Sequence, residues 1–256
     1  MNDLPLLVER EGAIAIISFN RPDVLNALDV AMAQAFAAAC RDLAGDDDVR
    51  VVVLRGKGKA FMAGGDLQAL RADPAGAVNA LIPPVHEAVR LLAAMPKPVL
   101  ASVHGAAAGA GMSVVLAADL ALASSGTRFN FAYSDIGASC DGGMSWSLPR
   151  VVGLRKAMEI ALLGETFDAD EAMRLGLLNA VVAPDGLENA TLALARRLAG
   201  RESASMAHLK QLLRASSGQT LECQLEAEHA AFLDCARRPG FGAAIDHFFK
   251  QRSARR

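Results

Sequence analysis

The sequence is poor in the residues that stabilise small secreted domains or bind metals. Its four cysteines, Cys40, Cys140, Cys223 and Cys235, lie far apart, and no pair has the C-x-x-C spacing of a zinc site or a redox dithiol. The five histidines include no H-x-x-x-H pair. We therefore expect reduced, mostly buried thiols and no metal site.

Excess charge of one sign and long apolar runs are missing as well. The formal net charge is -2, with acidic and basic residues interspersed, so we expect no nucleic acid partner. The longest apolar stretches, such as residues 106–118, are interrupted by glycine or serine and are too short to span a membrane. Residues 1–11 show no secretory signal. These absences predict a cytoplasmic protein without a membrane partner.

What the sequence does contain is enough apolar residues for a full globular core. Of its 256 residues 52% are hydrophobic, and the 22 glycines and 10 prolines are close to ordinary usage. Apolar, β-branched runs predict strands at 13–19, 49–54 and 99–103, each followed by turn residues and a helical pattern. We expect an α/β fold in which the strands at 49–54 and 99–103 are buried on both faces.

Helical patterns fill much of the remaining sequence. In the first part of the chain they predict helices at 30–43, 82–94 and 111–118, the first capped by Asp29. Residues 70–82 have the character of a loop-rich stretch, and their path does not follow from the pattern. Beyond residue 154 we expect only helices, at 156–163, 169–175, 186–198, 204–213, 221–236 and 241–250.

Two glycine-bearing turns each follow a strand and lead into a helix, at residues 63–66 and 105–111. The unpaired N–H groups at the start of a helix carry the positive end of its dipole and stabilise a developing oxyanion. Two such turns facing each other would form an oxyanion hole. Alternatively, the glycines serve only tight turns and close helix contacts. Their spacing fits neither a dinucleotide-binding fingerprint nor a P-loop, and residues 143–147 lack the second glycine of a nucleophile elbow.

Four motifs follow one another along the chain: Asn20-Arg21-Pro22 through Leu25-Asn26-Ala27-Leu28, Phe61-Met62-Ala63-Gly64-Gly65-Asp66-Leu67, Lys97-Pro98-Val99 through His104-Gly105, and Ala107-Ala108-Gly109-Ala110-Gly111. In this order they resemble the successive signatures of the crotonase, or enoyl-CoA hydratase/isomerase, superfamily, and the resemblance covers nearly the whole chain. It implies an α/β, ClpP/crotonase-like spiral of ββα units over residues 1–195. A C-terminal helical trimerisation region over residues 196–256 is implied as well.

The resemblance also implies the substrate and the residues that bind it. The substrate is an acyl-CoA thioester, so coenzyme A is part of the substrate and no separate cofactor is expected. The peptide N–H groups of Gly65 and Ala110 would polarise the thioester carbonyl. The nucleotide and pantetheine path would be lined by Leu25, Ala27, Ala63, Asp66 and Leu67. Linear, branched and aromatic-derived acyl groups all fit the sequence.

The family resemblance further implies a homotrimer or a homohexamer. The last predicted helices carry more apolar aromatic surface than a terminal tail usually does. These side chains suit either a contact between subunits or packing onto the chain's own core, and they are Phe232, Phe241, Phe248 and Phe249.

At the residues that decide the family's chemistry, this sequence departs from the hydratase pattern. The two glutamates of a hydratase fall at Ser113 and Tyr133, and neither side chain activates a water as a carboxylate would. The acid that remains is Asp141. Residues 133–163 resemble the ring-opening enoyl-CoA isomerases of phenylacetate breakdown and, more loosely, the Δ3,Δ2-enoyl-CoA isomerases. In both groups a single acid at this place moves the proton.

The resemblance therefore implies an enoyl-CoA isomerase in which Asp141 takes a proton from C2 and returns it at C4. Enoyl-CoA hydration is the alternative. A less favoured one is 4-chlorobenzoyl-CoA dehalogenation, because His86 and Asp141 match that branch's histidine and nucleophile, although Tyr133 replaces its tryptophan. His86 and Tyr133 are either accessory catalytic residues or packed side chains. A non-catalytic acyl-CoA-binding subunit is the hypothesis from another class.

Overall fold

The computed structural model describes residues 4–253, and its strands form two sheets. The larger sheet is parallel except for the pairing of β1 with β2. Its strands, in spatial order, are β1 (Leu6–Glu11), β2 (Ile14–Phe19), β3 (Val51–Gly56), β4 (Val99–Val103), β6 (Leu120–Ser124) and β9 (Ala180–Val182). The smaller sheet contains β5 (Ala106–Ala108), β7 (Arg128–Asn130) and β8 (Phe167–Asp168).

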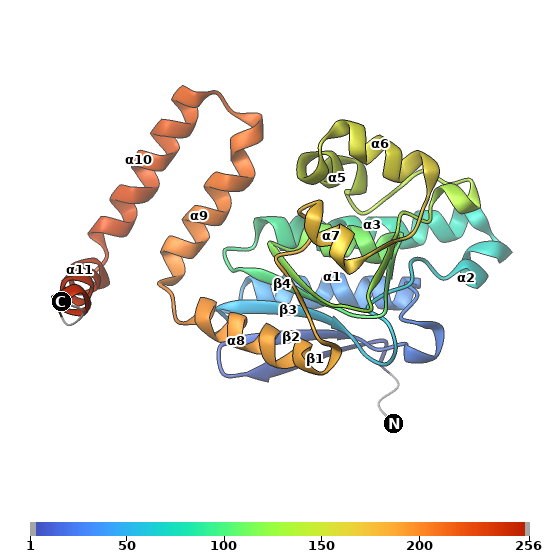
Figure 1. Ribbon diagram of the computed structural model, residues 1–256, viewed down its shortest axis with the longest axis horizontal. Helices are drawn as coiled ribbons and strands as arrows, with labels where there is room; N and C mark the ends of the chain where they lie inside the picture. The colour runs from blue at the N-terminus through green and yellow to red at the C-terminus, as the bar shows by residue number, and fades with distance from the viewer. Residues whose placement is uncertain (1–3, 254–256) are drawn as a thin grey trace.

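Helices cover both faces of the larger sheet, which confirms the predicted α/β class (Figure 1). On one face α1 (Val30–Ala44) packs against α3 (Pro74–Ala94), and α8 (Leu187–Ala199) lies on the other. The Asp29 carboxylate accepts a hydrogen bond from the Met32 N–H at 2.8 Å, which confirms the predicted cap of α1.

The remaining helices are shorter or lie outside these two layers. None of the helices that the structure describes is long and apolar enough to cross a membrane. Short 3-10 helices are η1 (Pro22–Val24), η2 (Ser134–Ile136), η3 (Pro184–Gly186) and η4 (Ser216–Gly218). The other α-helices are α2 (Leu67–Ala72), α4 (Ala110–Ala117), α5 (Met144–Val152), α6 (Leu154–Leu163), α7 (Ala169–Arg174), α9 (Ser203–Ala215), α10 (Leu221–Arg237) and α11 (Gly240–Ser253).

The central strands are apolar on both faces because each face meets a helical layer. Every residue of β2 and β4 is buried. In β2, Ile14 and Ile16 pack toward α8, whereas Ile17 and Phe19 belong to the main core beneath α1 and α3. This alternation follows from the two-residue repeat of a strand. The prediction of two-sided burial is confirmed for 51–54 and 99–103, whereas Arg50 is only partly buried and precedes the strand.

The prediction of a loop-rich stretch at residues 70–82 is wrong, because these residues are largely helical in α2 and α3. Asp66 caps α2, and the Asp73 carboxylate accepts from the Gly76 N–H at 3.1 Å at the start of α3. Pro74 occupies the beginning of α3, where a missing N–H breaks no helical hydrogen bond. Pro74 thus marks the start of a helix, and Pro83 and Pro84 lie inside that helix.

The prediction of only helices beyond residue 154 is also incomplete. The six predicted helices are present as α6 to α11, but β8 and β9 lie among them. These strands have two and three residues and are held by pairing with β7 and β6. A segment this short shows no alternating pattern of its own, so only the partner strands reveal it.

Helices α9 and α10 form a hairpin that stands away from the two sheets, with α11 at its end (Figure 1). The second half of α9 is attached to the rest of the chain by charged side chains. The buried Lys210 Nζ lies 2.7 Å from Asp119 Oδ2 and 2.7 Å from the Leu92 carbonyl oxygen, and Arg214 Nη2 lies 2.6 Å from Asp119 Oδ1. The predicted division after residue 195 falls within α8 and stays a prediction.

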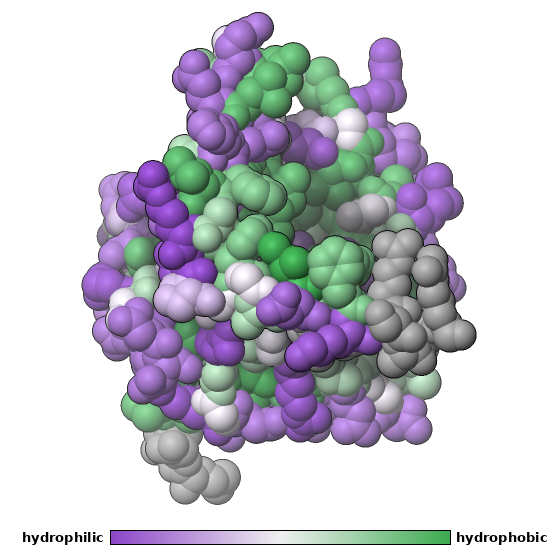
Figure 2. Space-filling view, turned by 90° about the vertical axis from the view of Figure 1, so that its left-hand side faces the viewer, coloured by the Kyte–Doolittle hydropathy of each residue, from purple (hydrophilic) through white to green (hydrophobic). Residues whose placement is uncertain are grey.

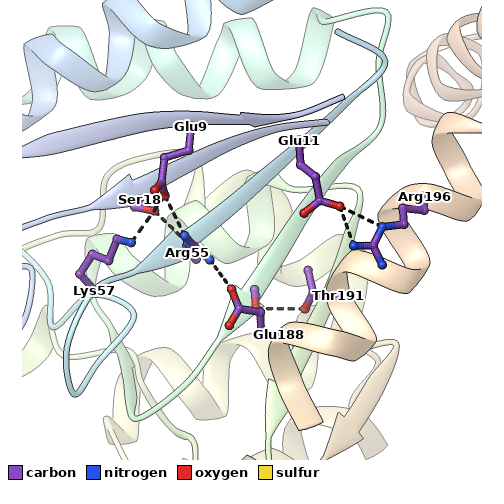
Figure 3. Close-up of polar contacts among 9 residues, drawn as sticks. Glu9, Glu11, Ser18, Arg55, Lys57, Glu188, Thr191 and Arg196 are labelled. Carbon is purple, nitrogen blue, oxygen red and sulfur yellow. Dashed lines mark hydrogen bonds and ion pairs between the residues drawn. The ribbon is translucent and has the colours of Figure 1, made fainter. Parts of the chain in front are cut away.

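Arg55 on β3 connects β1 with α8 (Figure 3). Its guanidinium lies 2.7 Å from Glu9 and 2.8 Å from Glu188. The hydrogen bond from Arg55 holds the pKa of Glu9 below its usual value. Next to the contact between Arg55 and Glu188, the buried Thr191 hydroxyl donates to Ser102 Oγ at 3.0 Å. These contacts attach α8 to the sheet along a polar strip.

Asn26 is fully buried and fixes the segment that precedes the first glycine turn. Its φ of 57° is a left-handed conformation, which asparagine adopts more readily than most residues. The Nδ2 atom donates to the carbonyl oxygens of Lys57 and Ala60 at 2.9 and 2.8 Å, and Oδ1 accepts from the Arg21 N–H at 2.8 Å. Both hydrogen-bonding ends of the amide are therefore used inside the protein.

We expect Asn26→Ala to destabilise the fold by about 2–4 kcal/mol, because it leaves buried carbonyl oxygens without donors. Urea unfolding followed by circular dichroism measures the change. Asn189→Ala, at an exposed position of α8, is the matched control and should change stability by less than about 0.5 kcal/mol. Equal unfolding midpoints for the two variants would contradict the role given to Asn26.

Candidate active site

A cavity of about 400 Å³ lies between the two glycine turns and the start of α3. It brings together four of the predicted catalytic residues, Gly65, Ala110, Tyr133 and Asp141. Its walls are otherwise mostly apolar, and the remaining lining residues are Leu28, Ala63, Gly64, Leu67, Leu70, Val78, Leu81, Ile82, Gly109, Ala132, Ile136, Ala138 and Ser139. The arrangement suits an uncharged acyl group next to a small number of polar atoms.

The two glycine turns lie against each other at one end of this cavity. A Cβ atom added to Gly109 would lie 3.7 Å from the Gly64 Cα. Gly65 forms a parallel bridge with Leu28, in which the neighbouring residues Gly64 and Asp66 supply the hydrogen-bonding atoms. The Gly65 N–H therefore stays outside the bridge.

Ala110 is the first residue of α4, so its N–H has no partner within the helix. In the described part of the chain, no hydrogen bond is formed by the N–H of either Gly65 or Ala110. Two unpaired backbone donors thus occur at one cavity, and one of them is at the positive end of a helix dipole. This arrangement is suited to stabilise negative charge on a bound oxygen atom.

Asp141 is the acid at this cavity. It is half-buried and lies three residues before the start of α5, where its carbonyl oxygen accepts from the Met144 N–H at 3.1 Å. Tyr133 Oη donates to Asp141 Oδ1 at 2.5 Å, a short bond of the kind formed between a hydroxyl and a charged carboxylate. Among the described lining residues, Asp141 carries the sole carboxylate.

Ser113 completes a cluster with Tyr133 and Asp141. Its Oγ lies 3.1 Å from Tyr133 Oη and donates to the Asp141 carbonyl oxygen at 3.0 Å. Burial, together with the nearby charge of Asp141, raises the pKa of Tyr133 well above its usual value, so the phenol stays a proton donor. Sequence reasoning treated Ser113 only as the loss of a glutamate. Its spacing from Tyr133 gave no sign that the two side chains meet.

His86 lies outside the cavity lining, behind the loop that carries Asp141. Its Nε2 accepts a hydrogen bond from the Gly142 N–H at 3.2 Å, which places the ring proton of the neutral imidazole on Nδ1. Of the predicted catalytic residues, His86 is thus the one that the structure does not bring to the cavity. Its contact holds the backbone next to Asp141.

The residues predicted for the nucleotide and pantetheine path divide into two groups. Ala63 and Leu67 line the cavity, whereas Leu25, Ala27 and Asp66 lie beside it. Leu25 is exposed, and its carbonyl oxygen accepts from the Ala63 N–H at 3.0 Å.

Asp66 is occupied by contacts within the chain. Its carboxylate accepts from N–H groups at the start of α2 and forms an ion pair with Arg21 at 3.0 Å. Burial opposes the charged form, but the hydrogen bonds from Arg21 and from the backbone outweigh it and hold the pKa of Asp66 below its usual value. Asp66 therefore fixes the turn as a charged group.

Comparison with known proteins gives matches along nearly the whole chain. The family model described as Enoyl-CoA hydratase/isomerase matches residues 9–255. The chain is 33% identical over 252 residues to 1,2-epoxyphenylacetyl-CoA isomerase of Escherichia coli strain K12, which covers 97% of this chain and 96% of that protein. It is 32% identical over 253 residues to 4-chlorobenzoyl coenzyme A dehalogenase-2 of an Arthrobacter species, and the match covers 96% of this chain and 91% of that protein.

A solved structure agrees with these matches. The crystal structure of an enoyl-CoA hydratase from Polaromonas sp. JS666 superposes with a TM-score of 0.91 at 34% identity, and covers 96% of this chain and 97% of that one. Family match, sequence identity and fold all confirm the resemblance that the motifs carry. The chain therefore belongs to the enoyl-CoA hydratase/isomerase family, whose enzymes act on acyl-CoA thioesters, and it has the crotonase fold.

Proposed function

We propose that this protein is an enoyl-CoA isomerase that shifts a carbon–carbon double bond by a 1,3-proton transfer. The observation that carries the proposal is the single carboxylate, Asp141, among the described residues that line the cavity. Adding water to a double bond is the work of two glutamates in the hydratases, and their positions here hold Ser113 and Tyr133. A proton shift needs only one group that first accepts and then returns a proton.

The mechanism uses the two backbone donors and one oxygen of Asp141. The thioester carbonyl oxygen binds the N–H groups of Gly65 and Ala110. Asp141 removes a proton from C2, and the electron pair of the broken C–H bond passes into a dienolate whose charge rests on that oxygen. Asp141 then gives the proton to C4, and the double bond between C3 and C4 becomes one between C2 and C3. The apolar walls strengthen these electrostatic interactions.

The coenzyme A part of the substrate is proposed to follow the segment beside the first glycine turn. Ala63 and Leu67 line the cavity itself, and Leu25, Ala27 and Asp66 continue from it toward the surface. The exposed side chain of Leu25 offers an apolar contact for a pantetheine arm. Tyr133 is proposed to act on Asp141, and His86 on the loop behind it.

Hydration is the second candidate, because solved neighbours such as the Polaromonas protein carry that name. Dehalogenation has weaker support. It would need His86 near the reacting atoms, whereas His86 Nε2 is engaged by the Gly142 N–H outside the cavity lining.

We further propose that the protein assembles as a homotrimer or homohexamer through its C-terminal helices. Figure 2 shows an apolar area in the middle of the face that carries the hairpin. Phe232 and Phe241 contact each other edge to face at 6.0 Å, but Phe232 does not pack onto the chain's own core. Large side chains with more than half of their surface exposed in this region are Leu213, Leu221, Leu225, Phe232, Phe248 and Phe249.

The isomerase proposal predicts that a 3-enoyl-CoA gains conjugation when the protein is added, which ultraviolet absorbance detects. Asp141→Asn should lower kcat/KM by about 100- to 10,000-fold, because an amide does not accept and return the proton. Asp135→Asn, on the same loop but outside the cavity lining, is the matched control and should retain activity. If the 3-enoyl-CoA is unchanged and a 2-enoyl-CoA loses conjugation, the protein is a hydratase. If a panel of acyl-CoA thioesters bind to the protein but none is converted, the result would favour a non-catalytic subunit.

The assembly proposal predicts that wild-type protein elutes as a trimer or hexamer in size-exclusion chromatography with light scattering. Phe232→Glu should shift the population toward monomer, because it places a charge in an apolar contact. Val8→Glu, at an exposed position of β1, serves as the control and should leave the mass unchanged. A monomeric wild-type protein at micromolar concentration would show the proposal to be wrong.

A further inference from the structure

The hydrogen bonds around Asp141 assign different tasks to its two carboxylate oxygens. Tyr133 Oη donates to Oδ1 at 2.5 Å. Among the described residues, no hydrogen bond is donated to Oδ2. One oxygen is therefore fixed by the protein, while the other is left for a proton that comes from a ligand in the cavity.

The hydroxyl protons account for this division. Ser113 Oγ lies 3.0 Å from the Asp141 carbonyl oxygen and 3.5 Å from that of Gly109. Ser113 Oγ also lies 3.1 Å from Tyr133 Oη, and because a carbonyl oxygen only accepts, the single Ser113 proton is shared between the Asp141 carbonyl oxygen and Tyr133 Oη. The Tyr133 proton goes to the carboxylate, the stronger acceptor, so Ser113 is the donor in its contact with Tyr133. When Oδ2 carries a proton, Oδ1 still accepts from Tyr133.

Burial and backbone contacts keep this cluster closed on the protein side. Ser113 is 1% and Tyr133 8% exposed. A Cβ on Gly142 would lie 2.8 Å from the Ser113 Cβ, so the loop after Asp141 is pressed directly onto Ser113. From the other side, His86 Nε2 accepts from the Gly142 N–H at 3.2 Å. On the side of Ser113 and Tyr133, Asp141 therefore faces buried side chains.

Resting on the isomerase function proposed above, we propose that Ser113 and Tyr133 are positioning residues that reserve Oδ2 of Asp141 for the substrate proton and shield it from exchange with water. The C2–H bond breaks as the Oδ2–H bond forms, and the same proton then leaves Oδ2 as the C4–H bond forms. The hydrogen at C4 of the product is thus the one that left C2. No other reactant takes part in the transfer.

The test runs the isomerisation of a 3-enoyl-CoA in D2O and measures deuterium at C4 of the product by mass spectrometry. We expect wild-type product to contain mostly the original hydrogen. Tyr133→Phe and Ser113→Ala should each raise the deuterium content at least about twofold and lower kcat on the order of tenfold with little change in KM, because the carboxylate is no longer held in place. Ser145→Ala, an exposed serine on α5, should behave as wild type.

A second measurement tests the contact between Tyr133 and Asp141 without any substrate. Tyr133 is the one tyrosine in the sequence, so ultraviolet absorbance reports its ionisation directly. A free tyrosine ionises at about pH 10. Because burial and the charge of Asp141 raise the pKa of Tyr133, the folded wild type should form no tyrosinate at that pH. In Asp141→Asn the ionisation should begin at lower pH, because the negative charge has been removed.

The outcomes separate this inference from the proposed function. Equal deuterium content in wild type, Tyr133→Phe and Ser113→Ala overturns the shielding role even if the protein is an isomerase. If wild type isomerises no 3-enoyl-CoA, the proposed function is wrong, and the Tyr133 titration alone decides the anchoring. Ionisation near pH 10 in wild type, or an unchanged titration in Asp141→Asn, then overturns it.

Discussion

The site depends on a backbone contact at which no side chain fits. Met62 forms a parallel bridge with Ala107, and a Cβ on Gly111 would lie 2.2 Å from the Met62 carbonyl oxygen. Glycine at position 111 therefore allows the first turn of α4 to lie directly on the segment that leads to Gly65. Because of this contact, the unpaired N–H groups of Gly65 and Ala110 reach the same cavity. A larger residue at position 111 would separate the two donors.

The polar cluster at the same cavity contains a single acidic side chain among the described lining residues. A carboxylate at the position of Ser113 would bring a second negative charge next to Asp141, and like charges this close disfavour each other's charged form. The hydroxyls of Ser113 and Tyr133 instead satisfy Asp141 without adding charge. Among the described side chains, this cluster therefore supplies one carboxylate and two neutral hydroxyls, which suits the proposed proton transfer.

The motifs predicted the fold class and the place of both glycine turns. Residues 61–67 and 107–111 identified both glycine turns, because their close approach requires glycine and leaves a signature in the sequence. The contact of Ser113 with Tyr133 was not predictable, since it depends on where α4 and the loop after β7 meet in space. Strands β8 and β9 were missed for a similar reason, because pairing with distant strands stabilises them more than their own residues do.

Helix α3 links the cavity to the C-terminal hairpin. Val78, Leu81 and Ile82 in its first half line the cavity, and the carbonyl oxygen of Leu92 near its end accepts from Lys210 of α9. Ten residues of helix separate Ile82 from Leu92, a distance of roughly 15 Å at the rise of an α-helix. His86, whose ring holds the backbone beside Asp141, lies between these two points. The same helix thus walls the cavity, supports the loop of Asp141 through His86 and anchors α9.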